Sequence, residues 1–329
     1  MGASLHDIVS LLGGGALLYL GAEWLVRGAA GFALSLGISQ LTVGLTVVAF
    51  GTSAPELVVS VQAAVEGRGA MALGNVLGSN IANLGLILGL AALVKPARVD
   101  GALRRRELPM LVASTLALPL VLARDTVPPA AGAGLVLVGV LYTAWMAYTA
   151  RSKREVAEAR EAAAETAAAT EGAGAPQPRS RTWLALTALV GFGLLLLGSH
   201  LFVGGATAIA RALGMSEWLV GMTLVAVGTS LPELATSLVA ARRGHSDIAV
   251  GNAIGSNIFN VLLCLGAASA LGRVSVPRAS VAADLTALVA LTLLGALFLR
   301  TERTMQRWEG AVLFAAYGAY MVWRIAAGG

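Results

Sequence analysis

Two glutamates stand inside long apolar segments, where an ionisable side chain is costly to bury. Glu56 lies within the apolar stretch 42–65, and Glu233 lies within the stretch 217–240. No lysine or arginine occurs in either stretch, so a basic neighbour on the same segment does not neutralise the carboxylate. An ionisable residue at membrane depth indicates a functional site by default. The two carboxylates therefore predict a site for a cation.

The same motif surrounds both glutamates. GTSAPEL begins at Gly51, and GTSLPEL begins at Gly228. Pro55 has no N–H to donate and clashes with the carbonyl one turn earlier, so each motif predicts a broken helix. The break frees backbone carbonyls around 49–52 in the first copy and around 226–229 in the second. Irregular backbone at membrane depth is tolerated only where it is buried or lines a cavity. We therefore expect backbone oxygens beside each carboxylate.

A second pair of motifs adds neutral oxygens. GNVLGSNIAN begins at Gly74, and GNAIGSNIFN begins at Gly251. Their Asn and Ser residues recur every four positions and so share one face of a helix. For Asn75, Asn80 and their counterparts, a role in helix packing remains as open as a role in the site. The residues that we favour for the site are Ser79, Asn83, Ser256 and Asn260.

The candidate ligands are all oxygen atoms, because neither histidine nor cysteine contributes to these motifs. Carboxylate, hydroxyl, amide and carbonyl oxygens suit hard cations rather than zinc or copper. Calcium takes six to eight such oxygens, and two glutamates balance its charge. The same hydroxyls and carbonyls suit Na⁺ once Ca²⁺ leaves, so the two ions should compete. Protons should also compete for the carboxylates.

The elements that position these residues are membrane-spanning helices. The chain of 329 residues is 57% apolar and 12% charged, against about 25% charged residues in soluble domains. This composition excludes a soluble enzyme with one membrane anchor. The apolar blocks have the length of a helical span, which excludes the short alternating segments of a membrane β-barrel. The ten predicted spans are 7–35, 42–65, 70–93, 107–123, 128–150, 182–213, 217–240, 247–270, 280–300 and 307–326.

The two halves of the chain are copies of each other. Both motif pairs are separated by 177 positions, and 30 of the 56 positions in 36–91 are identical to their counterparts at that offset. Each half holds five predicted spans, and an odd number places the second copy upside down in the membrane. The sequence thus predicts an all-α polytopic protein of two inverted five-helix repeats. The first repeat is 1–150, a linker is 151–181, and the second repeat is 182–329.

The loop charges predict the orientation. With the N-terminus outside, 16 lysines and arginines lie in inner loops and six lie on the outer side. We expect a multi-pass protein of the cell membrane, which is the inner membrane in cells with two. The positive-inside rule places both termini on the outer side and the 151–181 linker in the cytoplasm. The net charge of +5 is explained by this topology and does not indicate a nucleic-acid partner. Nothing in the sequence requires a cofactor or an obligatory protein partner.

At the paired GTSxPE and GSNIxN motifs, the sequence resembles the prokaryotic branch of the sodium/calcium exchanger family, within the cation/calcium exchanger superfamily. The resemblance covers nearly the whole chain apart from the linker. It implies ten helices, of which four central ones hold the ions and the long first and sixth slide as a pair. It also implies that several Na⁺ ions exchange for one Ca²⁺. By match to the family motifs, the calcium ligands are Thr52, Glu56, Thr229 and Glu233. The residues that line the flanking sodium sites are then Ala49, Ser53, Ser79, Ala226, Ser230 and Ser256, with Asn83 and Asn260 in the centre.

One position departs from several relatives. These relatives, which include members that also move potassium, carry Asp where this chain has Asn260. The amide removes a carboxylate, which argues against potassium co-transport and leaves the ion count open.

Three other functions compete with a Na⁺/Ca²⁺ antiporter that exports Ca²⁺. A H⁺/Ca²⁺ antiporter of the same fold would use Glu56 and Glu233 as proton acceptors, although the hydroxyl-rich motifs argue for Na⁺. A cation channel would need no counter-ion. An intramembrane enzyme is the least favoured, because the sequence has no His/Asp metal cluster, no Ser–His pair and no nucleotide loop.

Overall fold

Helices make up nearly all of the part of the chain that is described. The computed structural model describes residues 4–99, 101, 103–149, 180–214, 228–301 and 304–326. In the first half, the α-helices are α1 (Leu5–Leu36), α2 (Gln40–Val43), α3 (Ala49–Thr52), α4 (Ala54–Val65), α5 (Gly69–Ala82), α6 (Gly89–Val94), α7 (Leu108–Val121) and α8 (Pro129–Thr149). In the second half, they are α10 (Arg181–Ala212), α13 (Leu231–Arg243), α14 (Ser246–Phe259), α15 (Gly266–Leu271), α16 (Arg278–Thr301) and α17 (Arg307–Ala326). Four π-helical turns join or extend them: η1 (Gly44–Val48), η2 (Asn83–Leu88), η3 (Leu103–Glu107) and η5 (Asn260–Leu265).

Six helical segments in the described residues are long and apolar enough to cross a membrane. They are Leu5–Leu36, Gly69–Val94, Pro129–Met146, Arg181–Ala212, Ser246–Leu271 and Arg278–Arg300. A seventh arises if Gln40–Thr52 and Ala54–Val65, which meet at 44°, count as one broken span. The chain is therefore a helical polytopic membrane protein.

The ten predicted spans exceed this number for three local reasons. The α7 helix has only 14 residues, although η3 extends it at its N-terminus. The α17 helix contains Arg307, Glu309 and Arg324, which reduce its apolar character. The predicted span 217–240 is described only from residue 228 onward.

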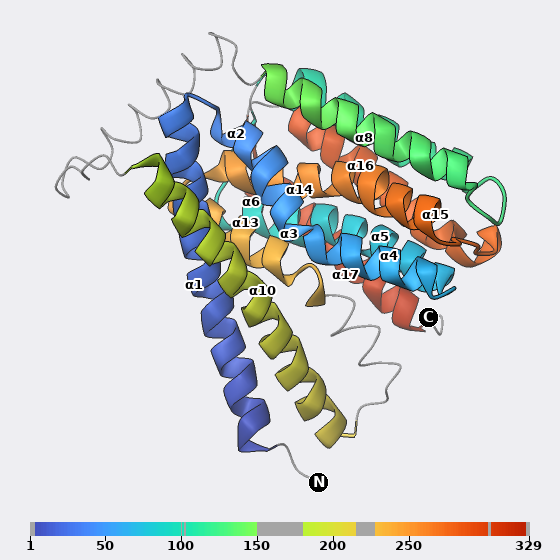
Figure 1. Cartoon of the computed structure of the whole chain (residues 1–329), viewed down its shortest axis with the longest axis horizontal. Coiled ribbons are helices and arrows are strands. Elements are labelled where there is room, and N and C mark those ends of the chain that lie inside the picture. Colours follow the sequence, from blue (N-terminus) through green and yellow to red (C-terminus); the bar gives the residue numbers. More distant parts are fainter. Residues whose placement is uncertain are drawn as a thin grey trace.

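The two longest helices, α1 and α10, lie side by side along one flank of the other helices (Figure 1). Each has 32 residues, and the two run antiparallel. Gly21 of α1 lies against Gly191 and Leu195 of α10 so closely that a Cβ at Gly21 would be 2.6 Å from the Leu195 nitrogen and 2.7 Å from the Gly191 oxygen. Small residues permit such backbone contact between membrane helices.

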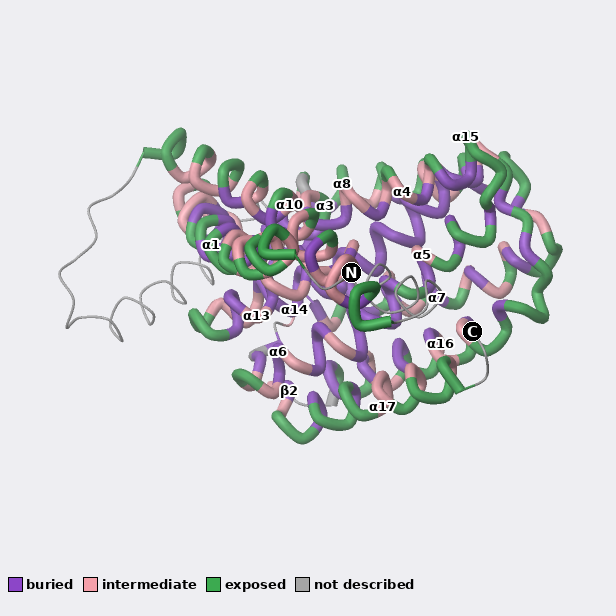
Figure 2. Tube along the Cα trace, turned by 90° about the horizontal axis from the view of Figure 1, so that it is seen from below, coloured by how far each residue is buried: buried purple, intermediate pink, exposed green. Residues whose placement is uncertain are grey.

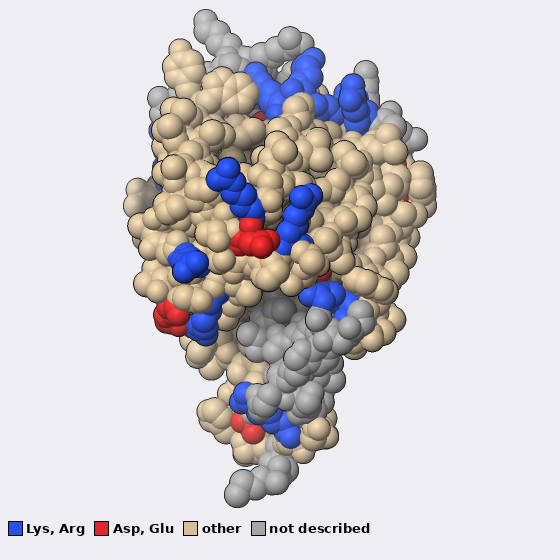
Figure 3. Space-filling view, turned by 90° about the vertical axis from the view of Figure 1, so that its right-hand side faces the viewer, with Lys and Arg blue, Asp and Glu red and all other residues tan. Residues whose placement is uncertain are grey.

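The interior is formed by the two continuous segments α5–η2–α6 and α14–η5–α15. In the tube of Figure 2, buried residues are concentrated along α5, α6 and α14, while exposed residues follow the outer helices. Within an apolar stretch of 18 residues in each span, 89% is buried in Ser246–Leu271 but only 17% in Arg181–Ala212. On the face seen in Figure 3, uncharged side chains cover most of the surface. The polar motifs therefore lie in the protein interior, and the apolar outer helices face the lipid.

The offset of 177 residues reappears in the architecture. The segments α5, η2 and α6 have counterparts of the same lengths in α14, η5 and α15, each 177 positions later. Short extended pairings recur at nearly the same offset, shifted by one residue on one side. Strands β1 (Ala97–Arg98) and β2 (Thr304–Met305) pair antiparallel, and Ser275, the counterpart of residue 98, forms a bridge with Thr126.

Candidate ion-binding site

The first GTSxPE motif breaks its helix where the sequence predicts, with a bend centred on Ser53. The α3 helix ends at Thr52, Ser53 adopts φ −87° and ψ 5°, and α4 begins at Ala54. The Ala49 carbonyl keeps a donor, because the Ser53 N–H donates to it at 3.0 Å. The helical partner of the Gly51 carbonyl would be Pro55, which has no N–H. The break therefore leaves the Gly51 carbonyl without the donor that a continuous helix would provide.

The second motif repeats the break but secures its free carbonyl differently. Ser230 adopts φ −90° and ψ 7°, and α13 begins at Leu231. The Gly228 carbonyl, which lacks a helical donor because of Pro232, accepts a hydrogen bond from the Ser199 hydroxyl of α10 at 2.9 Å. The long helix α10 is thus connected directly to the broken backbone of the second motif.

The two glutamates are held by serines from the opposite half of the chain. The Ser53 hydroxyl donates to Glu233 Oε1 at 3.0 Å. The Ser230 hydroxyl donates to Glu56 Oε1 at 3.3 Å. Glu56 is 0% exposed and Glu233 is 1% exposed. Within the described residues neither glutamate forms a salt bridge. The two motifs face each other, and their carboxylates belong to one buried site.

Two asparagines connect the central helices to these motifs. Asn75 Nδ2 donates to the Glu56 backbone carbonyl at 3.2 Å and to Ser60 Oγ at 2.9 Å. Asn252 forms the equivalent bonds, to the Glu233 carbonyl at 3.3 Å and to Ser237 Oγ at 3.0 Å. Both asparagines therefore hold a glutamate-bearing helix in place.

The motif threonines close this network across the two halves. Thr52 Oγ1 lies 3.1 Å from Asn252 Oδ1 and 3.0 Å from the Val48 carbonyl. Thr229 Oγ1 lies 3.4 Å from Asn75 Oδ1. Each threonine thus contacts the asparagine of the other half, which links each motif to the opposite central helix.

Several buried oxygens on these helices have no hydrogen-bond partner among the described residues. They include Glu56 Oε2, Glu233 Oε2, Ser79 Oγ, Ser256 Oγ and Asn83 Oδ1, besides Asn80 Oδ1 and Thr236 Oγ1. Buried polar atoms are nearly always paired, and an unpaired one costs about 1–3 kcal/mol. Carboxylate, hydroxyl and amide oxygens are ligands that Ca²⁺ and Na⁺ accept. These atoms therefore fit a site that binds hard cations.

The two central amides are not equivalent. Asn83 donates its Nδ2 to Asn257 Oδ1 at 3.4 Å and leaves its Oδ1 unpaired. Asn260 Oδ1 accepts from the Cys264 thiol at 3.4 Å, which leaves Nδ2 unpaired. The residue at the Cys264 position in the first half is Ile87, which has no donor. The two halves thus present different amide atoms to the site.

Both central amides begin a π-helical turn, which sequence reasoning did not predict. The η2 turn starts at Asn83, and η5 starts at Asn260. π-helical turns inside α-helices are rare and are frequent at functional sites. Their i→i+5 bonding shifts the side chains that follow, so the stripe of residues spaced by four does not continue past these asparagines. The two turns lie 177 positions apart, but the repeat does not by itself predict a π-helical turn.

Most of the predicted site residues lie together in this region. Eleven of the twelve are described, and all except Thr229 are buried: Ala49, Thr52, Ser53, Glu56, Ser79, Asn83, Ser230, Glu233, Ser256 and Asn260. Thr229 is partly exposed. Ala226 lies outside the described residues. The contacts that sequence reasoning left open or missed are those of Asn75 and Ser60, of their counterparts Asn252 and Ser237, and of Ser199 and Cys264.

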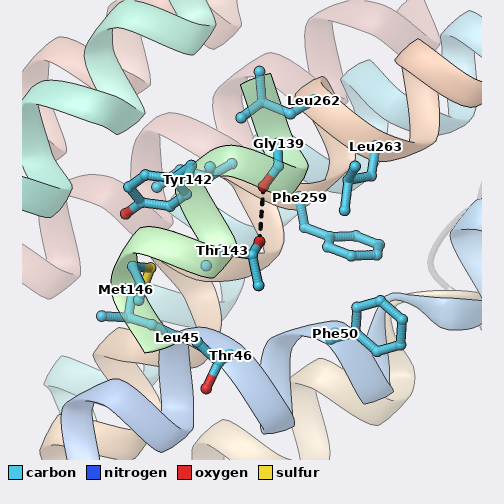
Figure 4. Close-up of a pocket in the computed structure, with 12 residues that line it drawn as sticks. Leu45, Thr46, Phe50, Gly139, Tyr142, Thr143, Met146, Phe259, Leu262 and Leu263 are labelled. Atoms are coloured by element: carbon cyan, nitrogen blue, oxygen red, sulfur yellow. Dashed lines mark hydrogen bonds between the residues drawn. The ribbon is translucent and has the colours of Figure 1, made fainter. Parts of the chain in front are cut away.

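A small cavity beside α3 is separate from this site. Figure 4 shows Phe50 of α3 and Phe259 of α14 at one side of it and α8 at the other. The two rings meet edge to face with centroids 4.9 Å apart. The Thr143 hydroxyl in the lining already donates to the Gly139 carbonyl at 2.8 Å, and the lining contains no carboxylate. The cavity therefore does not provide ligands for a cation.

Known proteins match this chain over both of its halves. The family model described as sodium/calcium exchanger protein matches residues 6–148 and again residues 183–326. CaxA of Alkalimonas amylolytica is 40% identical over 320 residues, which is 95% of this chain and 96% of that protein. The sodium/calcium exchanger MaX1 of Methanosarcina acetivorans is 32% identical and covers 96% of this chain and 97% of its own length.

A solved structure agrees with the fold. The sodium-calcium exchanger NCX_Mj, soaked with Na⁺ and Ca²⁺, superimposes with a TM-score of 0.82 at 30% sequence identity. The match covers 98% of this chain and 99% of that one.

Proposed function

Because this chain belongs to the sodium/calcium exchanger family, we propose that it is a Na⁺/Ca²⁺ antiporter that exports Ca²⁺ by alternating access. Members of this family are membrane transporters and not enzymes, and Ca²⁺ and Na⁺ are transported ions rather than cofactors. The observation that carries the proposal is the pair of buried glutamates, each held by a serine of the other half and each with one unpaired oxygen.

The proposed calcium ligands are the side chains of Thr52, Glu56, Thr229 and Glu233. Two carboxylates supply the charge that Ca²⁺ requires, and hydroxyls and carbonyls complete its oxygen shell. The proposed sodium sites on either side use Ala49, Ser53, Ser79, Ala226, Ser230 and Ser256, with Asn83 and Asn260 between them. Support comes from the unpaired oxygens of Ser79, Ser256 and Asn83, which lie on helices that the Asn75 and Asn252 bonds join to the glutamates.

The proposed architecture is two inverted repeats of five helices, 1–150 and 182–329, with 151–181 as a cytoplasmic linker. Both termini then lie on the outer side of the membrane, opposite the cytoplasm. The equal offset of paired contacts supports a repeat, because Ser53–Glu233 and Ser230–Glu56 exchange roles at 177 positions. The positive charges of the loops support the orientation.

In the proposed transport cycle, α1 and α10 move as one body against the remaining helices. The backbone contact of Gly21 with Gly191 and Leu195 favours joint movement, because it leaves no space for side chains between the helices. The bond from Ser199 to the Gly228 carbonyl connects this pair to the second broken helix. Movement of the pair would therefore change the backbone beside Glu233. In this way the opening of the site to either side of the membrane would be coupled to ion binding.

The counter-ion dependence of flux tests the proposed exchange. Purified protein in vesicles loaded with Na⁺ is diluted into Na⁺-free medium that contains ⁴⁵Ca²⁺ and a protonophore. We expect calcium uptake that depends on the Na⁺ gradient and persists when the proton gradient is abolished. Uptake that follows a proton gradient alone would support the H⁺/Ca²⁺ alternative. Uptake that needs no counter-ion would indicate a channel.

Calcium affinity should fall as pH falls, whichever counter-ion is used. A carboxylate must be ionised to bind a metal ion, so each proton taken up by Glu56 or Glu233 removes a charge that holds Ca²⁺. The two carboxylates belong to one buried site, so the pH midpoint belongs to the pair. Isothermal calcium titrations between about pH 5 and 8 should show weaker binding at the acid end. An affinity that stays constant over this range would contradict proton competition at these carboxylates.

A further inference from the structure

The α1–α10 pair carries a groove on its outer surface. Its lining comes entirely from these two helices and consists of Trp24, Arg27, Trp183, Leu186, Thr187 and Val190. The groove has a volume of about 230 Å³. It forms because the glycine contacts bring the two backbones together while large side chains diverge on either side. Both tryptophans are exposed, although they are among the largest apolar side chains of the protein.

Arg27 supplies a positive charge at one edge of the groove. Its Nη2 donates to Glu23 Oε1 at 2.9 Å, and its side chain remains 53% exposed. Glu23 is also bound by Arg243 of α13, whose Nε lies 2.9 Å from Oε2. Two arginines thus share one carboxylate, which leaves a net charge of +1 on the cluster. The Arg27 guanidinium has five N–H donors, so it retains donors for an anion.

The groove lies near one end of the pair. Trp183 is the third residue of α10, and a Cβ at Gly28, next to Arg27, would be 2.5 Å from the Ala188 nitrogen. Val190, at the far end of the lining, is then about 14 Å from the start of α10. Tryptophan and arginine are the residues that favour the boundary between lipid headgroups and acyl chains.

We propose that this groove is a binding site for one anionic phospholipid. Its headgroup phosphate is bound by Arg27, with Trp183 on the side nearer the start of α10, and its acyl chain runs deeper along Val190 and the indole ring of Trp24. Basic pockets between membrane helices bind anionic headgroups in this way. A lipid in the groove would contact both helices of the pair at once. Lipid binding is separate from ion exchange, so the test below does not depend on the proposed function.

Quenching by brominated lipids measures this binding directly. In the test protein, Trp145, Trp218, Trp308 and Trp323 are replaced by Phe, so that only the two groove tryptophans fluoresce. Vesicles contain either brominated phosphatidylglycerol or brominated phosphatidylcholine in a background of unlabelled phosphatidylcholine. We expect the relative binding constant to favour phosphatidylglycerol about fivefold. This factor corresponds to the attraction between one arginine and an anionic lipid surface.

The variant Arg27→Gln should reduce this preference to about one. Glu23 keeps its bond to Arg243 in that variant, so the carboxylate does not lose its only partner. The matched control is Arg300→Gln, an exposed arginine of α16 outside the groove, which should keep the fivefold preference. Arg27→Lys, which retains the charge, should also keep most of it. Equal quenching by both lipids, or a preference that survives Arg27→Gln in folded protein, would overturn the proposal.

Discussion

Replacing Glu56 or Glu233 by Gln should abolish calcium transport while the protein still folds. Each substitution keeps the side-chain volume and removes one of the two charges that would balance Ca²⁺. Breaking a buried ion pair by removal of one partner costs about 3 kcal/mol or more, which corresponds to a loss of more than a hundredfold in calcium affinity. Uptake of ⁴⁵Ca²⁺ into vesicles and calcium titration of the purified protein measure the two losses.

The control for this prediction is Glu66→Gln. Glu66 ends the same helix, α4, but lies outside the apolar span, and hydrogen bonds from Gln62 and Arg68 hold the pKa of its carboxyl below the usual range. The same chemical change at this exposed position should leave transport close to that of the unmodified chain. Size-exclusion profiles and thermal unfolding verify that all three variants fold. Wild-type calcium transport by folded Glu56→Gln or Glu233→Gln would refute the assigned site.

The two glutamates at the centre of the candidate site could be identified from the sequence, for specific reasons. A carboxylate in an apolar span is rare enough to be informative, and the repeat at 177 positions identified Glu56 and Glu233 as counterparts. Pro55 predicted a broken helix because its missing N–H acts locally. The family assignment from the GTSxPE and GSNIxN motifs is confirmed by the match of both halves to the exchanger model.

Contacts between distant parts of the chain were harder to predict from the sequence. The bonds from Asn75 to the Glu56 carbonyl and from Ser199 to the Gly228 carbonyl depend on which helices become neighbours, and spacing along one helix does not determine this. The π-helical turn at Asn83 is likewise a product of packing, since its residues have no special helix propensity. Hydropathy predicted ten spans, but it does not reveal how short or bent an individual helix is.

The glycines of α1 and α10 are a signal that was available but was not used. They recur every seven residues, at positions 14, 21 and 28 and at 191, 198 and 205. Seven residues are close to two helical turns, so each set forms one stripe. In the structure the two stripes face each other. A Cβ at Gly198 would be 2.6 Å from the Leu18 nitrogen, and one at Gly205 would be 2.6 Å from the Leu11 nitrogen.

We expect single alanine substitutions in this seam to reduce both stability and transport strongly. The Cβ added by Gly21→Ala or Gly198→Ala would lie 2.6 Å from backbone of the other helix, and backbone cannot rotate away as a side chain can. The helices must separate, which costs about 1–3 kcal/mol for overpacking of this kind. If α1 and α10 move as one body, the separated pair should also lose at least tenfold in transport rate. Thermal unfolding in detergent and ⁴⁵Ca²⁺ uptake measure the two effects.

Each seam variant has a matched control on its own helix. Gly13 of α1 and Gly193 of α10 have no heavy atom within 4 Å of an added Cβ. Alanine has a higher helix propensity than glycine by about 1 kcal/mol, so Gly13→Ala and Gly193→Ala should be neutral or slightly stabilising. The same substitution should therefore change the unfolding temperature in opposite directions, according to whether the added methyl group faces the other helix. Seam variants that unfold and transport like their controls would show that the two backbones are not in contact, and the proposal that the pair moves as one body would lose its structural basis.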